Sequence, residues 1–343
     1  MTTPDPHALI RVPDDTAFTL RVPAYPSQSD GSGMIRASTV LKLIDIAGAI
    51  TAKRHVTVQE RAEGVPELTV VTAMLDRTNF INPVRPWDII SAHSRLTRVW
   101  RTSMECQVTV SAWNFQTDET LPIATSYLIY VGVGTRGQKV PEGAMPGLQC
   151  STDDEKNLAA DADARKLNRE QEAKATPVLP VAEPDEPEAL ALIQTVEQAM
   201  TPNDANANGN VFGGVILALV HDAGRKSAEM HALSGPVACV RQDRMSFVAP
   251  VYIGETVRAQ AILTQSWTTS MEIQVDVHAI NPLTGQTRLV ASSYLVYVRL
   301  GFNDRPTAVP PWTPKTAIQQ QRTDSAQIRR KTRMLEAQRQ QTA

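Results

Sequence analysis

The sequence is poor in several features that would point to particular protein classes. Only three cysteines occur in 343 residues, Cys106, Cys150 and Cys239. They show no metal-ligand spacing, and an odd count argues against a disulfide framework, so we expect reduced thiols and no metal site. Aromatic residues make up only 5% of the chain, and the formal net charge is −2. Such a balance gives no sign of a nucleic-acid-binding surface.

Long hydrophobic runs are absent as well. No stretch approaches about 18 uninterrupted apolar residues, so the sequence predicts no transmembrane helix and no membrane partner. Residues 1–15 lack an apolar segment of signal-peptide length. We therefore expect a soluble, cytoplasmic protein. The apolar content of 42% is ample for two hydrophobic cores of ordinary size.

An internal repeat dominates the organisation of the chain. Residues 101–114 (RTSMECQVTVSAWN) match residues 268–281 (TTSMEIQVDVHAIN) without a gap. The same difference in residue number relates two further pairs of segments, which are 76–84 with 243–251 and 124–131 with 291–298. Three matching blocks in one register indicate a duplicated domain.

Upstream of these blocks the register of the repeat changes. Residues 41–55 align without gaps on residues 217–231, which places His55 over His231. A single loop, nine residues longer in the first copy, absorbs the difference between the two registers. Because loops tolerate insertions at low cost, this change does not weaken the repeat.

The segments outside the two copies are polar. Residues 151–190 are charged and Ala-rich and then Pro-rich, which predicts a polar helix over 154–174 and an extended linker over 176–188. From Lys315 the chain is rich in Gln and Arg, which favours a solvated helix or frayed tail over an oligomer-stabilising helix. We divide the chain into an N-terminal domain, a linker, a C-terminal domain and a tail, which span 10–148, 149–188, 189–302 and 303–343.

Each copy predicts one helix and several strands. The helices, 38–54 and 214–230, are apolar nearly all round their first turns, so we expect them to be wrapped on most sides. The strand segments alternate polar and apolar residues with period two, as at Val275, Val277 and Ala279. Short turns between them favour antiparallel pairing. The expected fold class is α+β, with an antiparallel sheet curled around a central helix in each copy.

A polar loop precedes the helix of the second copy. The segment 202–224 reads PNDANANGNVFGGVILALVHDAG, and Gly213-Gly214 stands where the helix begins. Glycines let the backbone approach a ligand, and the free N–H groups of a helix N-terminus attract negative charge. Such a site can hold an oxyanion during acyl transfer. A glycine turn needed only for packing is the alternative.

This segment resembles the helix-start motif of the acyl-CoA thioesterases with a hotdog fold. The motif is a Pro-x-x-x-Asn loop, a Gly-Gly pair and an acidic residue seven positions later. The F-x-x-P-V-x-x-G-[DE] block at 247–255 and the T-S-M-E strand at 269–272 are similar to the family as well. The resemblance covers roughly 16–133 and 191–300. It implies two hotdog domains that hydrolyse acyl-CoA to fatty acid and CoA without a cofactor.

The family resemblance also implies how the site is divided. In this family one module supplies the Asn loop and the Gly-Gly pair, and the other module supplies the acidic residue. The second copy carries Asn206, Gly213 and Gly214, but has His221 at the acidic position. The first copy has Asp45 at the matching position. One complete site can therefore be assembled from Asp45 of the first copy and the loop of the second.

The reciprocal combination lacks every expected element. It consists of Asp30, Ala37, Ser38 and His221. We therefore expect one working site and one relic in each chain. Asp222, one place further round the helix, is the rival acid if the helix phase differs from the ungapped alignment. His221 is interpreted as a structural group, with a proton carrier in the second site as the alternative.

The roles follow from thioester chemistry. The carbonyl gains negative charge when it is attacked, and the N–H of Gly214, with Gly213 as a second donor, would stabilise that charge. Asn206 would orient the attacking water or bond the thioester. Asp45 would act as general base on water or attack directly to give an anhydride, and both routes stay open. A buried carboxylate with a raised pKa would suit the base role.

Four further residues carry two interpretations each. Arg54 and His55 end the first helix, where a cation suits the helix dipole, and contact with CoA phosphates is the alternative. Thr269 and Ser270 begin a predicted strand, where they either line the site or serve as turn residues.

Two other functions were weighed. A hotdog enoyl-thioester hydratase or dehydratase would resemble G-D-x-N-P-[LIV]-H, which nothing here matches. A non-catalytic acyl-CoA-binding or scaffold protein is the second alternative, and the intact set of Asp45, Asn206 and Gly213-Gly214 argues against it. Because family members pair modules and often form trimers of pairs, we expect a homotrimer of double-hotdog chains.

Overall fold

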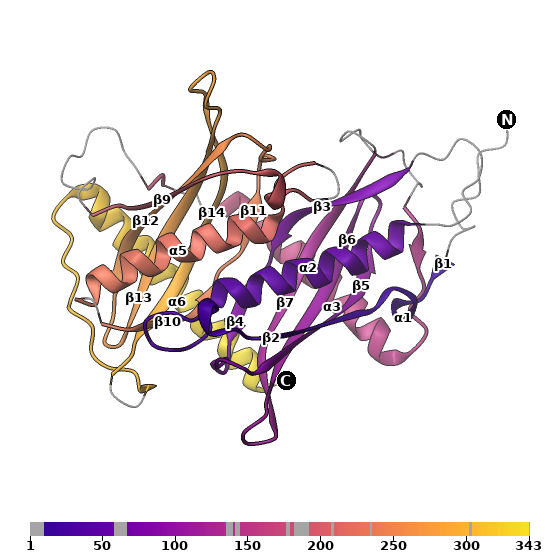
Figure 1. Cartoon of the computed structure of the whole chain (residues 1–343), viewed down its shortest axis with the longest axis horizontal. Coiled ribbons are helices and arrows are strands. Elements are labelled where there is room, and N and C mark those ends of the chain that lie inside the picture. Colours follow the sequence, from indigo (N-terminus) through magenta and orange to yellow (C-terminus); the bar gives the residue numbers. More distant parts are fainter. Residues whose placement is uncertain are drawn as a thin grey trace.

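The computed structural model of this chain describes two similar halves that lie side by side (Figure 1). The described residues are 10–57, 67–134, 140, 145–175, 179–181, 192–206, 209–233, 235–301 and 304–342.

The described strands build one continuous antiparallel sheet that runs through both halves. In the N-terminal half they are β2 (Phe18–Pro23), β3 (Leu68–Leu75), β4 (Thr78–Phe80), β5 (Ile89–Val99), β6 (Ser103–Asn114) and β7 (Glu119–Gly134). In the C-terminal half they are β9 (Gln194–Ala199), β10 (Val237–Gln242), β11 (Met245–Phe247), β12 (Thr256–Ser266), β13 (Ser270–Ile280) and β14 (Thr287–Arg299). A separate pair, β1 (Ile10–Arg11) and β8 (Gly147–Leu148), ties the start of the N-terminal half to its end.

The two halves meet edge to edge in the middle of the sheet. The strand order is β2-β5-β6-β7-β3-β11-β14-β13-β12-β9, and β4 and β10 form a second contact beside this path. At the seam Met245 pairs with Leu75, and Gln242 pairs with Thr78. Because main-chain hydrogen bonds join the halves, their relative position is fixed by the sheet itself.

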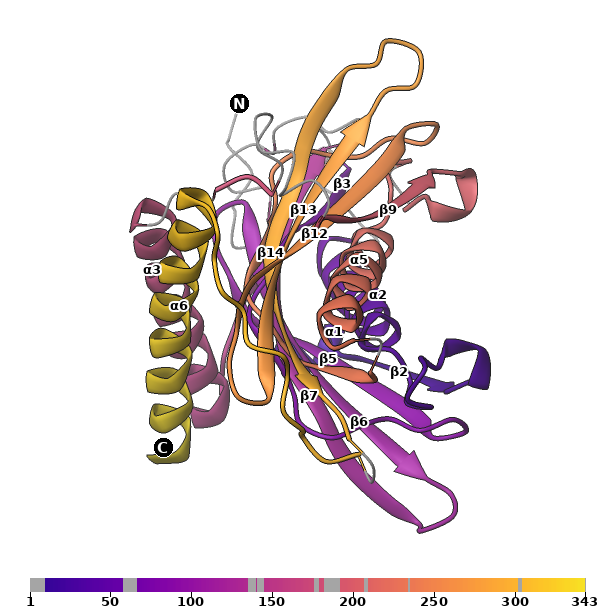
Figure 2. The same ribbon diagram turned by 90° about the vertical axis from the view of Figure 1, so that its left-hand side faces the viewer.

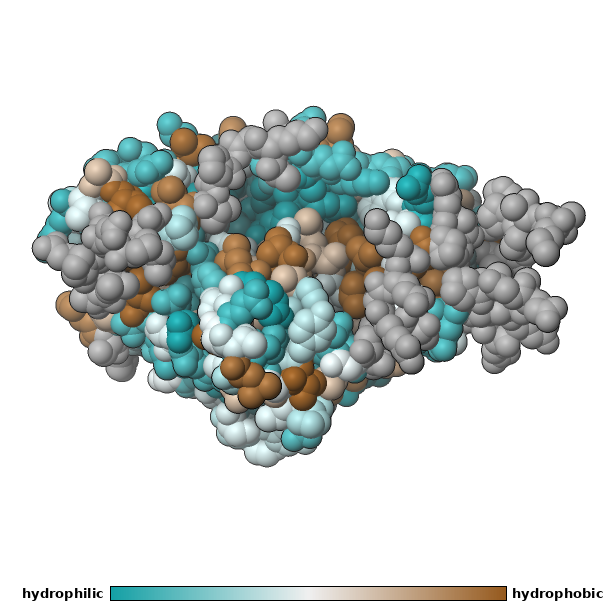
Figure 3. Space-filling view, turned by 90° about the horizontal axis from the view of Figure 1, so that it is seen from above, coloured by the Kyte–Doolittle hydropathy of each residue, from teal (hydrophilic) through white to brown (hydrophobic). Residues whose placement is uncertain are grey.

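The central helices α2 (Ala37–Val56) and α5 (Gly213–His231) lie together on one face of this sheet. Leu41, Ile44 and Leu217 are fully buried between the helices and the strands, as the apolar first turns predicted. The bounds agree with the predicted 38–54 and 214–230 to within two residues. The α+β fold with two hotdog domains is therefore confirmed. Seen from above, apolar side chains gather near the middle of the molecule (Figure 3).

Two long helices cover the opposite face of the sheet (Figure 2). The polar helix predicted over 154–174 is α3 (Asp153–Ala175). The segment predicted as a solvated helix or frayed tail contains α6 (Ala317–Thr342), which lies on the same face of the sheet as α3 and buries Gln319, Arg322 and Ala326. The segment is thus a helix, as one of the two predicted forms, but it is not fully solvated, because some of its arginines bind acidic side chains of the C-terminal half, as described below.

The predicted linker, 176–188, is described only at 179–181, and its other residues lie outside the described part of the chain. There the Val181 amide donates to Asp276 Oδ2 at 2.7 Å, so this stretch lies on the sheet. The domain boundaries given above stay a proposal. Of the described helices, including the short α1 (Pro13–Thr16), none is long and apolar enough to cross a membrane.

Candidate active site

Asp45 lies in the third turn of α2 and is completely buried. The Thr72 hydroxyl donates to Asp45 Oδ1 at 2.9 Å, and the Tyr130 hydroxyl lies 3.3 Å from the same oxygen. Thr72 of β3 and Tyr130 of β7 are register partners, so the two hydroxyls stand next to each other on the sheet. The sheet of the N-terminal half therefore fixes one oxygen of this carboxyl group.

The environment of Asp45 favours the protonated form of its carboxyl. Burial raises the pKa of Asp45 from 3.8 to about 6, because an ionised carboxylate loses its hydration there. Hydrogen bonds from Thr72, the Gly214 amide and Tyr130 act in the opposite direction and lower the pKa. The result is a carboxyl whose pKa stands close to neutral pH, the range that suits a general base.

The start of α5 approaches the other oxygen of this carboxyl from the C-terminal half. A Cβ added at Gly213 would lie 2.8 Å from Asp45 Oδ2, so any side chain at this position would collide with the carboxyl. The Gly214 amide lies near enough to lower the pKa of Asp45. Yet Oδ2 is buried and accepts no hydrogen bond of ordinary geometry from the described residues. The elements that the sequence assigned to different halves, Asp45 and Gly213-Gly214, thus meet.

Asn206 lies in the loop before α5. Its Oδ1 accepts a hydrogen bond from the Asn210 amide at 3.2 Å, and its carbonyl accepts one from the Gly209 amide at 3.0 Å. Asp30, the matching residue of the first copy, lines one small cavity together with Ala37 and His221. The repeat predicts that Asn206 lies near Gly213 and Asp45 in the way that Asp30 lies near Ala37 and His221. A contact of Asn206 with Gly213 or Asp45 stays a prediction.

The reciprocal cavity contains the rival acid. His221 is 4% exposed, and its Nε2 donates to Gln242 Oε1 at 2.8 Å. Burial lowers the pKa of His221 to about 4, so the imidazole is neutral at physiological pH. Asp222 and Arg225 line this cavity, which measures only about 20 Å³. Asp222 therefore lies at the reciprocal position and not beside Gly213.

The reciprocal cavity carries charged residues at positions where the aligned residues of α2 are apolar. In the alignment that places His55 over His231, Asp222 and Arg225 match Ile46 and Ala49 of α2. The reciprocal cavity thus carries two charged side chains where the site around Asp45 has apolar ones. An acyl chain would have to desolvate these charges, which is unfavourable.

Thr269 and Ser270 are placed by the strand register. Ser270 begins β13 and pairs with Val298 of β14, the neighbour of Tyr297. The Tyr297 hydroxyl donates to the backbone carbonyl of His221 at 3.2 Å. Ser270 lies two residues before Glu272 on β13 and therefore faces the outer side of the sheet, away from the reciprocal cavity, and no described contact brings either residue to Asp45.

Arg54 and His55 have structural partners at the end of α2. Arg54 Nη1 donates to the Ala17 carbonyl at 2.6 Å. His55 is fully buried and bonds the Pro146 carbonyl at 2.9 Å through Nε2. Burial lowers the pKa of His55 to about 4. The suggested contact of His55 with CoA phosphates is therefore wrong, because this side chain is neither accessible nor charged.

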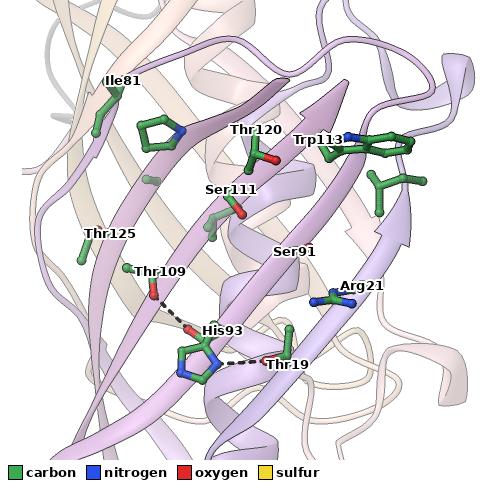
Figure 4. Close-up of a pocket in the computed structure, with 14 residues that line it drawn as sticks. Thr19, Arg21, Ile81, Ser91, His93, Thr109, Ser111, Trp113, Thr120 and Thr125 are labelled. Carbon is green, nitrogen blue, oxygen red and sulfur yellow. Dashed lines mark hydrogen bonds between the residues drawn. The ribbon is translucent and has the colours of Figure 1, made fainter. Parts of the chain in front are cut away.

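A wide depression lies elsewhere, on the outer face of the N-terminal half of the sheet (Figure 4). It is an open depression of about 880 Å³, where His93 Nδ1 bonds Thr19 Oγ1 at 2.9 Å and Trp113 stands at one end. In the C-terminal half the residue that matches Thr109 is Asp276, and there the chain around Val181 bonds to it. This depression is separate from the candidate site, because Asp45 lies on α2, on the opposite face of the sheet.

A network of buried charges on the outer face was missed by the sequence reasoning. Glu105 of β6 is fully buried and receives Arg165 of α3 at 2.7 Å. Arg169, one turn further along, bonds both Glu105 at 3.0 Å and Asp76 at 3.1 Å. The glutamate of the first T-S-M-E-like strand thus anchors a helix and does not line the site.

The C-terminal half repeats this arrangement residue for residue. Glu272 of β13 is fully buried and receives Arg329 of α6 at 2.6 Å, and Arg333 bonds Asp243 at 2.6 Å. Arg329 and Arg333 have the same spacing along their helix as the arginine pair of α3. The signal was present in the sequence as these two equally spaced pairs, but the low similarity of the surrounding residues hid it.

Ion pairs of this network also join the two halves. Arg77 of the N-terminal half bonds Glu336 of α6 at 2.9 Å. Arg244 of the C-terminal half bonds Asp76 at 3.1 Å and Glu172 of α3 at 2.7 Å. The two outer helices therefore hold the seam of the sheet from the side opposite the candidate site.

Known proteins share both the repeat and the fold. The model of the thioesterase superfamily matches residues 33–113 and 208–285, once in each half. The acyl-CoA thioester hydrolase YciA of Escherichia coli is 33% identical over 113 residues, which are 32% of this chain and 84% of YciA. This chain belongs to the acyl-CoA thioester hydrolase family.

Longer relatives match both halves of this thioester hydrolase. The human cytosolic acyl coenzyme A thioester hydrolase is 26% identical over 87% of this chain and 78% of its own length. The rat acetyl-coenzyme A thioesterase is 23% identical over 90% of this chain, which spans only 56% of that relative. The solved structure of an acyl-ACP thioesterase from Bacteroides thetaiotaomicron aligns with a TM-score of 0.50 at 14% identity, over 83% of this chain and 98% of that one. At this identity the likeness shows the fold alone.

Proposed function

We propose that this protein hydrolyses acyl-CoA to a free fatty acid and CoA at a single site between its two halves. Asp45 of the N-terminal half supplies the acid-base group, and the first turn of α5 in the C-terminal half supplies the oxyanion donors. The observation that carries this proposal is the Asp45 carboxyl, whose buried Oδ2 lies against Gly213 and accepts no hydrogen bond of ordinary geometry, with the Gly214 amide close by.

The charge that develops on the thioester oxygen would be stabilised by α5. The N–H groups at a helix N-terminus have no partner within the helix, and the helix dipole adds positive potential there. We assign the Gly214 N–H to the oxyanion, with Gly213 as the second donor. Asn206, at the entrance of the same helix, orients the water or bonds the thioester. Glycine is required at position 213 because a side chain there would collide with the Asp45 carboxyl and push the start of α5 away from the site.

Two routes are compatible with a carboxylate at this position. In the first, ionised Asp45 takes a proton from water as its oxygen attacks the carbonyl carbon, the C–S bond breaks, and the proton passes to the departing thiolate. In the second, Asp45 Oδ2 attacks the carbonyl carbon, CoA leaves, and water hydrolyses the resulting anhydride. A single turnover in H₂¹⁸O tests for the second route. If water attacks the anhydride at the Asp45 carbonyl carbon, ¹⁸O is incorporated into Asp45, whereas the first route leaves no ¹⁸O in this residue.

The reciprocal cavity is not assigned a turnover. It presents a neutral His221 where the first site has Asp45, and the charged pair Asp222 and Arg225 where the first site has Ile46 and Ala49. Neither a base of suitable strength nor an apolar wall for an acyl chain is therefore available there.

Release of free thiol from a panel of acyl-CoAs tests the proposal. We expect the Asp45→Asn variant to lose most of its turnover, and the Asp222→Asn variant, the matched change in the reciprocal cavity, to keep it. Retained turnover in Asp45→Asn together with its loss in Asp222→Asn would reverse the assignment. If the wild-type chain binds CoA but releases no thiol at any chain length, the scaffold function is favoured instead.

The assembly and the location stay predictions. A homotrimer of chains is expected from the family resemblance, and light scattering of the purified protein measures it directly. We propose a cytoplasmic location because the human relative is named as cytosolic.

A further inference from the structure

The Tyr130 hydroxyl lies between two acceptors that both belong to Asp45. It is 3.1 Å from the backbone carbonyl of Asp45 and 3.3 Å from Asp45 Oδ1. A phenolic hydroxyl carries a single proton, so it donates to only one of these oxygens at full strength. Because Tyr130 is completely buried on β7, these two oxygens are the acceptors that it reaches.

A glycine of α2 allows this approach. A Cβ added at Gly48 would be 2.5 Å from the Tyr130 hydroxyl oxygen, far inside ordinary contact distance. Gly48 lies three residues after Asp45, so the two residues share one side of the helix. The absence of a side chain at position 48 therefore lets the hydroxyl come within reach of the carboxyl.

The repeat separates the two acceptors. In the reciprocal half Tyr297 matches Tyr130, and its hydroxyl donates to the backbone carbonyl of His221 at 3.2 Å. His221 stands there in the place of Asp45. The bond to the helix carbonyl is therefore common to both halves and serves the fold. A bond to a side-chain carboxyl is described for Tyr130 and not for Tyr297.

The Tyr130 hydroxyl stays protonated while Asp45 titrates. Burial raises the pKa of Tyr130 well above its ordinary value, and the charge of Asp45 adds to this rise. The other influences on the pKa of Asp45 are its burial, Thr72 and the Gly214 amide, none of which is a charged side chain. Cys106 of β6 lies near Tyr130, and burial raises the pKa of its thiol, which therefore stays neutral. Tyr130 is thus a donor at every pH at which Asp45 changes its charge.

We propose that Tyr130 is a positioning residue whose hydroxyl turns from the backbone carbonyl of Asp45 to Oδ1 when the carboxyl ionises, and thereby keeps Oδ2 as the oxygen that acts on the thioester or on water. This inference rests on the proposed function and extends it to a residue buried behind the acid. A hydrogen bond to an ionised acceptor is stronger than one to a neutral acceptor, so the proton follows the charge to the side chain. Oδ1 then receives both Tyr130 and Thr72, and Oδ2 is left as the free base or nucleophile.

The pH dependence of thiol release in Tyr130→Phe tests this role. Phenylalanine keeps the ring against Gly48 but removes the donor to ionised Asp45. The acidic limb of kcat/KM should therefore move up by about one pH unit, the effect of about a tenfold change in acid dissociation. On the plateau at higher pH we expect kcat to fall about fivefold and KM to stay within about twofold, because the variant loses the orientation of the acid and no contact with the substrate.

Tyr297→Phe is the matched control, because it removes the same carbonyl bond from the other central helix. We expect its acidic limb to coincide with that of the wild-type chain. An equal upward shift in both variants would show a structural effect of the lost carbonyl bond. A limb that stays in place in Tyr130→Phe would show that the hydroxyl does not act on the carboxyl. Either result overturns the proposal.

Failure of the proposed function is distinguishable from failure of this inference. Tyrosine labelled with ¹³C at Cζ reports the hydroxyl of the wild-type chain without any turnover. The Tyr130 signal should move as the pH crosses about 6, the pKa of Asp45, and should stay constant in Asp45→Asn. If the chain releases no thiol but this signal titrates, the proposed function fails while the turning of the hydroxyl stands. A Tyr130 signal that is constant through this range in the wild-type chain refutes the inference whatever the chain catalyses.

Discussion

Replacing Asp45 with asparagine is expected to stabilise the protein at neutral pH while removing its turnover. The carboxyl is fully buried, and burial raises its pKa from 3.8 to about 6. In the unfolded chain the same group ionises near its ordinary pKa. The native state therefore carries a cost for the ionised form that asparagine, which does not titrate, does not have.

The sign and size follow from the two pKa values. Because the pKa is raised in the folded state, the stability contributed by Asp45 is fully present below 3.8 and is lost as the pH rises through about 6. The full loss is about 3 kcal/mol, of which about 1.4 kcal/mol falls between about pH 5 and about pH 8. Effects of the substitution that do not depend on pH, such as an altered hydrogen bond from Thr72, change the free energy of unfolding of the variant equally at every pH. They therefore do not alter the slope of the difference between the two proteins.

Denaturant unfolding of both proteins across this pH range measures the difference. The free energy of unfolding of Asp45→Asn minus that of the wild-type chain should rise from about pH 5 to about pH 7 and then level off. Two parallel pH profiles would refute the reasoning, because they would mean that Asp45 has the same pKa in the folded and unfolded states. A difference that falls with pH would mean that the carboxylate is stabilised as an ion.

The remaining predictions concern the rate, the oxyanion donors, the reciprocal cavity and the outer helices. With Asp45 as the base, kcat/KM should fall as the pH drops below about 6, and a rate profile that is flat through this range would contradict the assignment. Gly213→Ala should lower kcat about a hundredfold because its Cβ would lie 2.8 Å from Asp45 Oδ2, whereas Gly31→Ala, where the space is open, should not. His221→Gln should leave thiol release within about twofold of wild type, since a neutral group there takes no part; a large loss would show that the reciprocal cavity is used. Arg333→Ala should destabilise the chain by about 3 kcal/mol in urea because it leaves Asp243 and the buried Glu272 with one partner fewer, while Lys331→Ala on the exposed side of α6 should stay within about 0.5 kcal/mol.

The duplicated α+β fold could be predicted because hydrophobic periodicity and the repeat are local properties of the sequence. The meeting of Asp45 with Gly213 was expected from the family resemblance, which divides the site between two modules, and the repeat supplied the matching positions. The phase of the helix was the least certain part of the prediction, since Asp222 lies only one residue from His221, the position that matches Asp45. The register of the helix pair, which places Asp222 at the reciprocal cavity, depends on packing between distant segments.

The roles of the outer helices and of His55 could not be read from the sequence. α6 is polar, and its partly buried Arg329 and Arg333 pair with Glu272 of β13 and with Asp243 between β10 and β11, which are far away in sequence. His55 was expected to be a cationic side chain at a helix end, where it suits the helix dipole or contacts CoA phosphates. Its burial against Pro146 depends on a segment much further along the chain, which no pattern near His55 indicates.

The outer charge network and the two inner pockets have had different histories since the duplication. The network keeps the same acids and arginines in both copies, whereas the pockets differ at almost every position that bears on chemistry. In an assembly of two identical subunits, each substitution appears in both pockets at once, so neither pocket can change while the other is preserved. Fusion into one chain removes that coupling. If turnover belongs to the Asp45 site alone, as we propose, the reciprocal cavity can vary without loss of turnover, while the outer charge network keeps the same acids and arginines in both halves.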